Sequence, residues 1–186
     1  MHTSLVAAHS VPDDRHTSNV VAALALAVTD RVWRAAAEVV ELPQNDLVAV
    51  SALHHILGAP SIEQLRRVLG LSHSATVRLV DRLVAANLAS HQPGPDRRTT
   101  ATTLTADGHA AAERVRAARS ATVQTALDTL TDSDRATLDR IAGEVLVAMM
   151  RGAAATRWMC RLCDTGACGR YDDRCPIGCE LTRRTT

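Results

Sequence analysis

Residues 61–108 have the sequence SIEQLRRVLGLSHSATVRLVDRLVAANLASHQPGPDRRTTATTLTADG, and signals within this stretch decide the fold. Ser61, followed three positions later by Gln64, forms a capping box, which begins a helix. Gly70 supplies a tight turn, and Ser72 is placed to cap a second helix. Two helices joined by a short glycine-containing turn are typical of a helix-turn-helix. The first half of the stretch therefore predicts this motif.

The second of these helices has a polar face and an apolar face. Ser74, Arg78 and Arg82 recur every four residues on the polar face. The apolar face, expected to pack inward, consists of Val77, Val80, Leu83 and Val84. An exposed face bearing serine and arginine can lie in a DNA major groove, where arginine reads guanine edges and serine contacts phosphate. A solvated helix face fits the same spacing equally well.

The residues that follow favour the DNA-binding interpretation. Residues 88–91 predict a short strand, residues 92–98 a turn-rich tip, and the threonine-rich residues 99–104 a return strand. A two-stranded hairpin after a recognition helix is a wing. Arginine at its tip can enter the minor groove, where narrow A·T-rich stretches concentrate negative potential.

In order and spacing, these pieces resemble the winged-helix core of the MarR family of bacterial transcription regulators. The resemblance covers roughly residues 18–150 and rests on residues 65–83, Asn87-Leu88, the wing motif Asp96-Arg97-Arg98 and Leu104-Thr105-Ala106-Asp107-Gly108. It implies a mainly α fold with a small β wing. It also implies a non-enzymatic homodimer, built by the first helix and the two last helices, that binds a pseudo-palindromic double-stranded DNA operator.

The resemblance also suggests roles for individual residues. Arg78 matches a contact residue of the recognition helix, Arg98 the minor-groove arginine of the wing, and Asp96 the partner that orients it. Asn87 replaces the usual glycine and is tolerated because asparagine also adopts left-handed conformations. The candidate DNA-binding residues are Ser72, His73, Ser74, Thr76, Arg78, Arg82, Asp96, Arg97 and Arg98. Relatives without cysteines commonly respond to phenolic ligands.

The flanking sequence divides the chain into an arm (residues 1–17), a winged-helix and dimerisation domain (18–156) and a cysteine-rich tail (157–186). Residues 19–42 predict a long helix that is apolar on several sides, as at a subunit interface. Asn45 or Asp46 is expected to cap the next helix. The net charge of +1 means that any DNA-binding face is local. With no apolar run of eighteen residues, the chain is expected to be cytoplasmic.

All five cysteines of the chain lie in the tail, in the spacing Cys160-x2-Cys163-x4-Cys168-x6-Cys175-x3-Cys179. Such clustering indicates a metal, iron–sulfur or thiol-redox site. Close-set thiols followed by Cys175-Pro176 favour an iron–sulfur cluster slightly over zinc. We expect Cys160, Cys163, Cys168 and Cys175 to be the ligands, with Cys179 as a spare or resolving thiol.

Several functions remain open for this tail. It fits a sensor of redox or iron status that acts on DNA binding through the dimer, because it directly follows the last dimerisation helix. It also fits a structural zinc site in a regulator that responds to a phenolic-type effector. A thiol-redox protein is a weaker alternative, because no βαβ pattern surrounds the Cys-x-x-Cys. His54 and His55 are expected to be structural histidines.

Overall fold

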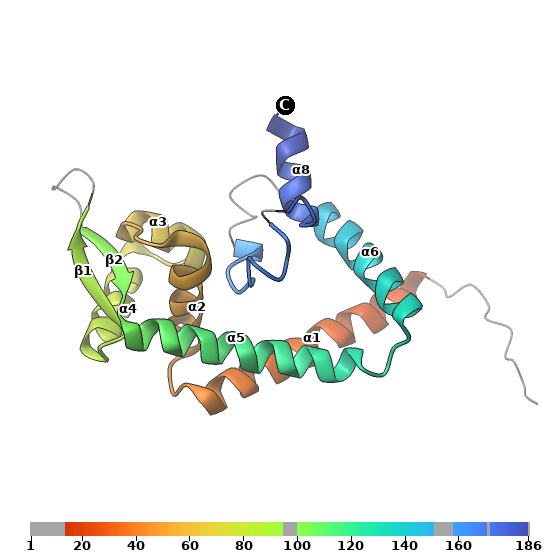
Figure 1. Cartoon of the computed structure of the whole chain (residues 1–186), viewed down its shortest axis with the longest axis horizontal. Coiled ribbons are helices and arrows are strands. Elements are labelled where there is room, and N and C mark those ends of the chain that lie inside the picture. The colour runs from red at the N-terminus through yellow and green to blue at the C-terminus, as the bar shows by residue number, and fades with distance from the viewer. Residues whose placement is uncertain (1–13, 95–99, 151–157, 171, 186) are drawn as a thin grey trace, which may run out of the picture.

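A computed structural model describes residues 14–94, 100–150, 158–170 and 172–185. The described part is mainly helical, with a single two-stranded sheet (Figure 1). The bounds are α1 Asp14–Val39, α2 Gln44–Ala52, a π-helix η1 Leu53–Leu57, α3 Ile62–Leu69, α4 His73–Ala85, β1 Ala89–Pro93, β2 Thr100–Leu104, α5 Ala106–Leu127, α6 Asp132–Ala148 and α8 Pro176–Thr185. None of the helices within these residues is long and apolar enough to span a membrane.

The winged-helix lobe is formed by α2, η1, α3, α4, the two strands and the first half of α5. The strands pair antiparallel, with Ala89 opposite Leu104 and Pro93 opposite Thr100, and the start of α3 adds a bridge from Ser61 to Ala101. The predicted winged helix-turn-helix is therefore confirmed. Its core is made of buried aliphatic side chains, including Leu47, Val50, Leu53, Leu65, Leu69, Leu79, Val80, Leu83 and Val115.

Local capping groups begin four of the described helices, and those at Ser61 and Ser72 were predicted. Ser61 and Gln64 form the reciprocal capping box, and the hydroxyls of Ser72, Thr105 and Thr131 each accept a backbone N–H at the start of α4, α5 and α6. Asn87 has a positive φ of 58°, in the left-handed region where asparagine replaces glycine at low cost. These positions fix where each helix of the lobe begins or where the chain turns.

At Gly108, the backbone of α5 lies close to the backbone of Leu88. A Cβ placed there would lie 2.0 Å from the carbonyl oxygen of Leu88, so only glycine lets the first turn of α5 pack against the chain leaving α4. The Thr105 hydroxyl donates to the Asn87 carbonyl at 2.6 Å, and the Thr105 N–H donates to the Leu88 carbonyl at 3.1 Å. This junction holds the wing against the base of α5.

The start of α2 differs from the prediction. Pro43 is its N-cap, and its carbonyl accepts the N–H groups of Asp46 and Leu47. Asp46 lies inside the first turn with its side chain buried, because its carboxylate is bound by Arg82 of α4. The prediction that Asn45 or Asp46 caps this helix is therefore wrong. Likewise, α1 begins at Asp14, so the last residues assigned to the arm are helical.

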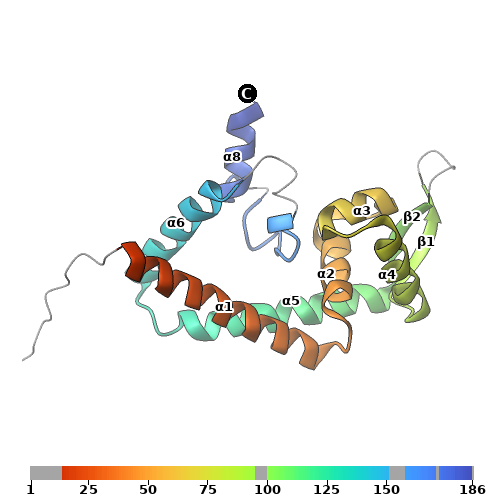
Figure 2. The same cartoon turned by 180° about the vertical axis from the view of Figure 1, so that it is seen from behind.

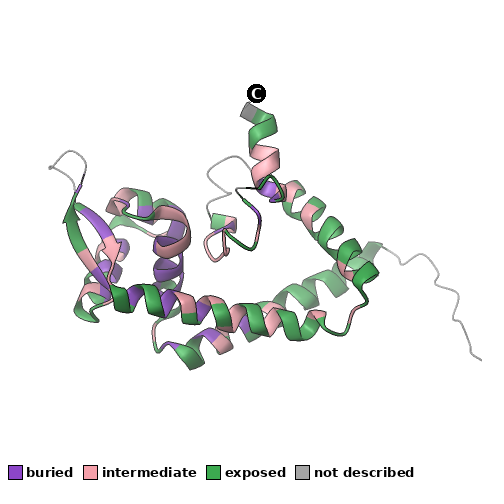
Figure 3. Ribbon diagram, in the orientation of Figure 1, coloured by how far each residue is buried: buried purple, intermediate pink, exposed green. Residues whose placement is uncertain are grey.

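Outside the lobe, α1 lies along α5, and α6 continues from the far end of α5 (Figures 1 and 2). Only Val32 and Ala36 of α1 are buried, and no residue of α6 is. Figure 3 shows the resulting change from purple in the lobe to green along these helices. Large apolar side chains are exposed on both: Val20, Val21, Leu24 and Leu26 on α1, and Leu138, Ile141, Val145 and Leu146 on α6.

The tail lies between the winged-helix lobe and α6, ending in α8, which packs on α6 (Figures 1 and 2). Pro176 at the start of α8 lies against Gly143 of α6. A second apolar cluster joins the three parts: buried Met150, Cys160, Cys175 and Ile177, packed with Ile56 of η1 and Val147 of α6, among others. The tail therefore touches the lobe as well as the last helix of the domain.

Candidate nucleic-acid interface and cysteine site

The exposed face of α4 carries the residues that sequence reasoning assigned to DNA. Ser72, His73, Ser74 and Arg78 are all exposed at its N-terminal end. Within the described residues, no carboxylate is paired with the Arg78 guanidinium. Backbone N–H groups and short polar side chains at a helix N-terminus suit phosphate, and an unpaired arginine one turn further suits a base edge.

Two predicted contact residues of α4 make bonds within the lobe. Thr76 is fully buried, and its hydroxyl donates to the Ser72 carbonyl at 2.9 Å. Its assignment as a DNA contact is therefore wrong, and its spacing with Val80 and Leu83 is the core pattern that could have shown this. Arg82 donates to both oxygens of Asp46, from Nε at 2.9 Å and from Nη2 at 2.6 Å. This fork ties α4 to α2.

The wing is described only at its base. Strands β1 and β2 hold the hairpin beside α4, with Ser90 and Thr103 joined by their hydroxyls at 3.1 Å. Asp96, Arg97 and Arg98 lie outside the described residues. Their assignment to the minor groove stays a prediction.

The four cysteines predicted as ligands lie in one apolar cluster of the tail. Cys160 and Cys175 are buried there, and Cys163 and Cys168 are partly buried against them. Two pairs can be distinguished by their influence on each other: the Cys163 thiol raises the pKa of Cys160, and burial, followed by the charge of Cys175, raises the pKa of Cys168.

In the first pair, Cys160 and Cys163, the pKa values of the two thiols are shifted in opposite directions. The hydrogen bond from Cys160 lowers the pKa of Cys163 to about 6, helped by the positive charges of Arg119 and Arg170. The same bond, together with burial, raises the pKa of Cys160. Thiolate is the form that binds metals and reacts with electrophiles, so Cys163 is the thiol most readily available for either.

Cys179 lies apart from these pairs. Its Sγ donates to the Asp173 carbonyl at 3.0 Å, one turn into α8. Gly178, next to it, donates its N–H to Cys175 Sγ at 3.3 Å. Hydrogen bonds from backbone N–H groups to sulfur are one way in which proteins set the reduction potential of a group held by thiolates. The apolar cluster that contains the other four cysteines does not include Cys179.

The tail contacts the helix-turn-helix directly. The Trp158 ring lies beside Gly70, the turn residue between α3 and α4, where a Cβ would be 3.6 Å from Trp158 Cζ3. Leu162 packs against the core of the lobe. The Asp164 carboxylate accepts from Arg116 of α5 at 3.3 Å. The tail was expected to act on DNA binding through the dimer. It also contacts the α3–α4 turn of its own chain, so a shorter path of contacts leads from the tail to α4.

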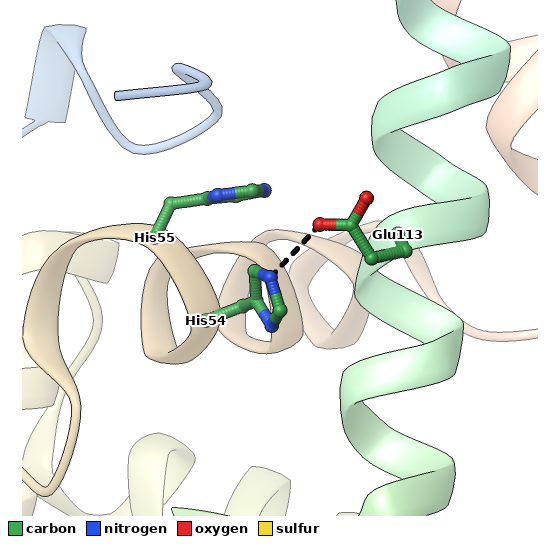
Figure 4. A group of neighbouring side chains, drawn as sticks. All are labelled: His54, His55 and Glu113. Carbon is green, nitrogen blue, oxygen red and sulfur yellow. Dashed lines mark ion pairs between the residues drawn. The ribbon is translucent and has the colours of Figure 1, made fainter. Parts of the chain in front are cut away.

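A polar cluster missed by sequence reasoning lies beneath the tail, between η1 and α5 (Figure 4). His54 Nε2 is 2.9 Å from Glu113 Oε1, and His54 Nδ1 is 2.8 Å from His109 Nδ1. Burial, and next the charge of His54, lowers the pKa of the adjacent His55. The sequence signal was weak, because 59 positions separate His54 from Glu113 and only the fold brings them together.

Comparison with solved structures places this geometry in a known fold. RV1404 from Mycobacterium tuberculosis is 23% identical with a TM-score of 0.70, over 77% of this chain and 99% of that one. A MarR family protein from Bacillus stearothermophilus is 18% identical with a TM-score of 0.67, over 76% and 100%. A mutant MarR from E. coli complexed with operator DNA is 21% identical with a TM-score of 0.53, over 73% and 99%.

The sequence comparison points the same way. No curated protein matches the chain significantly. Residues 43–99, which span α2 to the wing, match the MarR family. The chain therefore has the winged-helix fold of these structures, and the part of it that spans residues 43–99 is similar to the MarR family.

Proposed function

We propose that the chain is a sequence-specific, dimeric DNA-binding regulator of transcription that acts in the cytoplasm. The observation that carries this proposal is the exposed face of α4, with Ser72, His73, Ser74 and Arg78 standing clear of the core beside a wing. In a helix-turn-helix, this face enters the major groove, where phosphate contacts position the protein and arginine discriminates between bases.

The apolar surface of α1 and α6 supports a homodimer. Leu24 and Leu26 are 55% and 67% exposed, and the large apolar side chains of α6 are also exposed. Contiguous apolar surface of this kind marks an interaction site in a soluble protein. A twofold axis through these helices would place two α4 helices in half-sites about one helical turn apart, so the operator would be a pseudo-palindrome.

Selection from a pool of random duplexes tests this part of the proposal. The full chain should enrich a pseudo-palindromic sequence, and binding to it should exceed binding to scrambled duplex by on the order of 10³-fold or more at fixed salt. Equal affinity for selected and scrambled duplexes would reduce the protein to a nonspecific binder and contradict the proposal.

We further propose that Cys160, Cys163, Cys168 and Cys175 bind an iron–sulfur cluster. The location of these four cysteines in one apolar cluster, with the Gly178 N–H bonded to Cys175 Sγ, supports this ligand set. When bound, the cluster would supply a group whose oxidation state and assembly respond to oxidants and iron supply. The same four thiolates would also suit one structural zinc ion.

The position of the tail suggests what such a group would control. The tail touches the α3–α4 turn through Trp158 and α5 through Asp164. A tail this short has too little core to hold one shape alone, so ligand binding would set its order. The loaded tail would thereby hold the turn and the recognition helix in place, and losing the ligand would release them.

Metal and sulfide analysis of anaerobically purified protein tests the ligand. Iron with acid-labile sulfide, lost in Cys163→Ser and retained in the matched variant Cys179→Ser, is the expected result. Stoichiometric zinc without sulfide would assign the structural alternative. A Cys179→Ser variant that loses its iron would contradict the proposed ligand set.

A further inference from the structure

The cluster of His54, His55 and Glu113 has a geometry that a hydrogen-bond network alone does not satisfy. One ligand atom from each residue lies within 4.8 Å of the other two. Both histidines lie on the π-helix η1, and Glu113 faces them from α5 (Figure 4). π-Helical turns are rare and frequently lie at functional sites. Here the η1 turn directs two consecutive imidazoles toward one carboxylate.

His55 carries an unsatisfied nitrogen in this cluster. Its Nε2 is buried and has no hydrogen-bond partner among the described residues. A buried polar atom without a partner costs about 1–3 kcal/mol, so such an atom in a native fold requires an explanation. A bound cation would provide one, because a neutral imidazole nitrogen is the commonest metal ligand in proteins.

The other two residues are oriented as metal ligands are. His54 Nδ1 shares a proton with His109 Nδ1 at 2.8 Å, which fixes the ring and leaves Nε2 facing Glu113 Oε1. Arg116 Nε donates to the other carboxylate oxygen, Oε2, at 2.7 Å. Each of these two side chains is thus held through the atom that faces away from the cluster. Second-shell partners of this kind orient the ligands of metal sites.

We propose that His54, His55 and Glu113 bind a divalent transition metal ion of the zinc class, separately from the cysteine site. Two nitrogens and one carboxylate oxygen, with a fourth position for water, form a common zinc ligand set. Ligand atoms about 2.1 Å from a tetrahedral ion lie about 3.4 Å apart. The ligand atoms now lie within 4.8 Å of one another, so the cluster would tighten on binding an ion. Glu113 is partly exposed, which gives the ion a path from solvent.

The site adjoins the tail without sharing its ligands. Arg116 bridges Glu113 and Asp164, and the Thr165 hydroxyl donates to the His55 carbonyl at 3.3 Å. An ion here would therefore be sensed by the tail through Arg116. Because its ligands are nitrogen and oxygen alone, this site can be distinguished spectroscopically from one made of thiolates.

Cobalt(II) titration of the full chain tests the proposal, since cobalt replaces zinc and reports its ligands by absorption. The expected result is one equivalent whose visible bands lack thiolate-to-cobalt charge transfer and which zinc displaces. His54→Gln and His55→Gln should each weaken binding by at least the roughly 10–100-fold that the loss of a second-shell partner costs. The exposed His91→Gln on β1 is the matched control and should bind as wild type does. Cys163→Ser should retain this equivalent and lose any thiolate band, which separates the two sites.

Thermal unfolding supplies a second readout. Zinc should raise the melting temperature of Cys163→Ser and leave that of the double variant His55→Gln with Cys163→Ser unchanged. Should His54→Gln fail to fold, Glu113→Gln serves in its place. Wild type without a nitrogen-and-oxygen cobalt signal, or equal binding by wild type and His55→Gln, would overturn the proposal.

Discussion

Two arginines one turn apart on α4 should have opposite effects when removed. Arg82 binds both oxygens of Asp46, whose side chain is 1% exposed, whereas Arg78 has no such partner among the described residues. We expect Arg82→Ala to destabilise the fold and Arg78→Ala to weaken DNA binding. The pair separates a structural arginine from a base-reading one on the same helix.

The expected loss of stability in Arg82→Ala follows from the burial of Asp46. Breaking a buried ion pair by removing one member costs 3–5 kcal/mol, because a charge is left without compensation. The Arg82 side chain is 51% exposed, so water can partly replace it. We therefore expect a loss of about 2 kcal/mol from the free energy of unfolding. Arg82→Lys keeps the charge but loses the two-pronged geometry, and should fall between wild type and Arg82→Ala.

Urea unfolding at one fixed protein concentration measures this loss, since the stability of a dimer depends on concentration. Arg78→Ala is the matched control and should stay within about 0.5 kcal/mol of wild type. In fluorescence anisotropy with the selected operator, Arg78→Ala should lose about 1–3 kcal/mol of affinity and discriminate less between sequences. If Arg82→Ala unfolds at the wild-type urea concentration, the structural role given to Arg82 is refuted.

Three further predictions follow from individual contacts. Leu24→Asp should yield monomer or insoluble protein, because it places a charge in the proposed interface; a soluble dimer in sedimentation would contradict this. Gly108→Ala should lower the free energy of unfolding by about 2–3 kcal/mol, because its Cβ would overlap the Leu88 carbonyl; wild-type stability in urea would show that the α5 junction adapts. In metal-free protein, iodoacetamide should modify Cys163 before Cys160 at pH 7, with a rate that falls as the pH drops through about 6, since thiolate is the reactive form; mass spectrometry showing equal rates would contradict the lowered pKa.

Local sequence signals predicted the helix-turn-helix and wing well, and distant contacts account for most errors. The capping box at Ser61 and the cap at Ser72 act within a few residues, so the sequence alone predicted them. Asp46 has the side chain of a cap, but its partner is Arg82, 36 positions later. No local pattern contains such a pairing.

The candidate sites show the same difference between local signals and contacts of distant residues. The spacing placed Cys160, Cys163, Cys168 and Cys175 in one ligand set, and these four lie in one apolar cluster because they are close in sequence. Their role as ligands stays a prediction. The packing of the tail on the α3–α4 turn was not predictable, since Gly70 and Trp158 are 88 positions apart. The cluster of His54 and Glu113 was missed for the same reason, as η1 and α5 meet only in the folded chain.

The most direct test of the central claim compares operator affinity between the loaded and the metal-free tail. Binding should be measured at one salt concentration with loaded wild type, metal-free wild type, Cys163→Ser and Cys179→Ser. If the tail controls the recognition helix, the two forms of wild type should differ by about 5–150-fold, the usual range of coupling between sites. Cys163→Ser should then match the metal-free form and Cys179→Ser the loaded one. Equal affinities for all four proteins would contradict the claim and leave the tail as a structural clip.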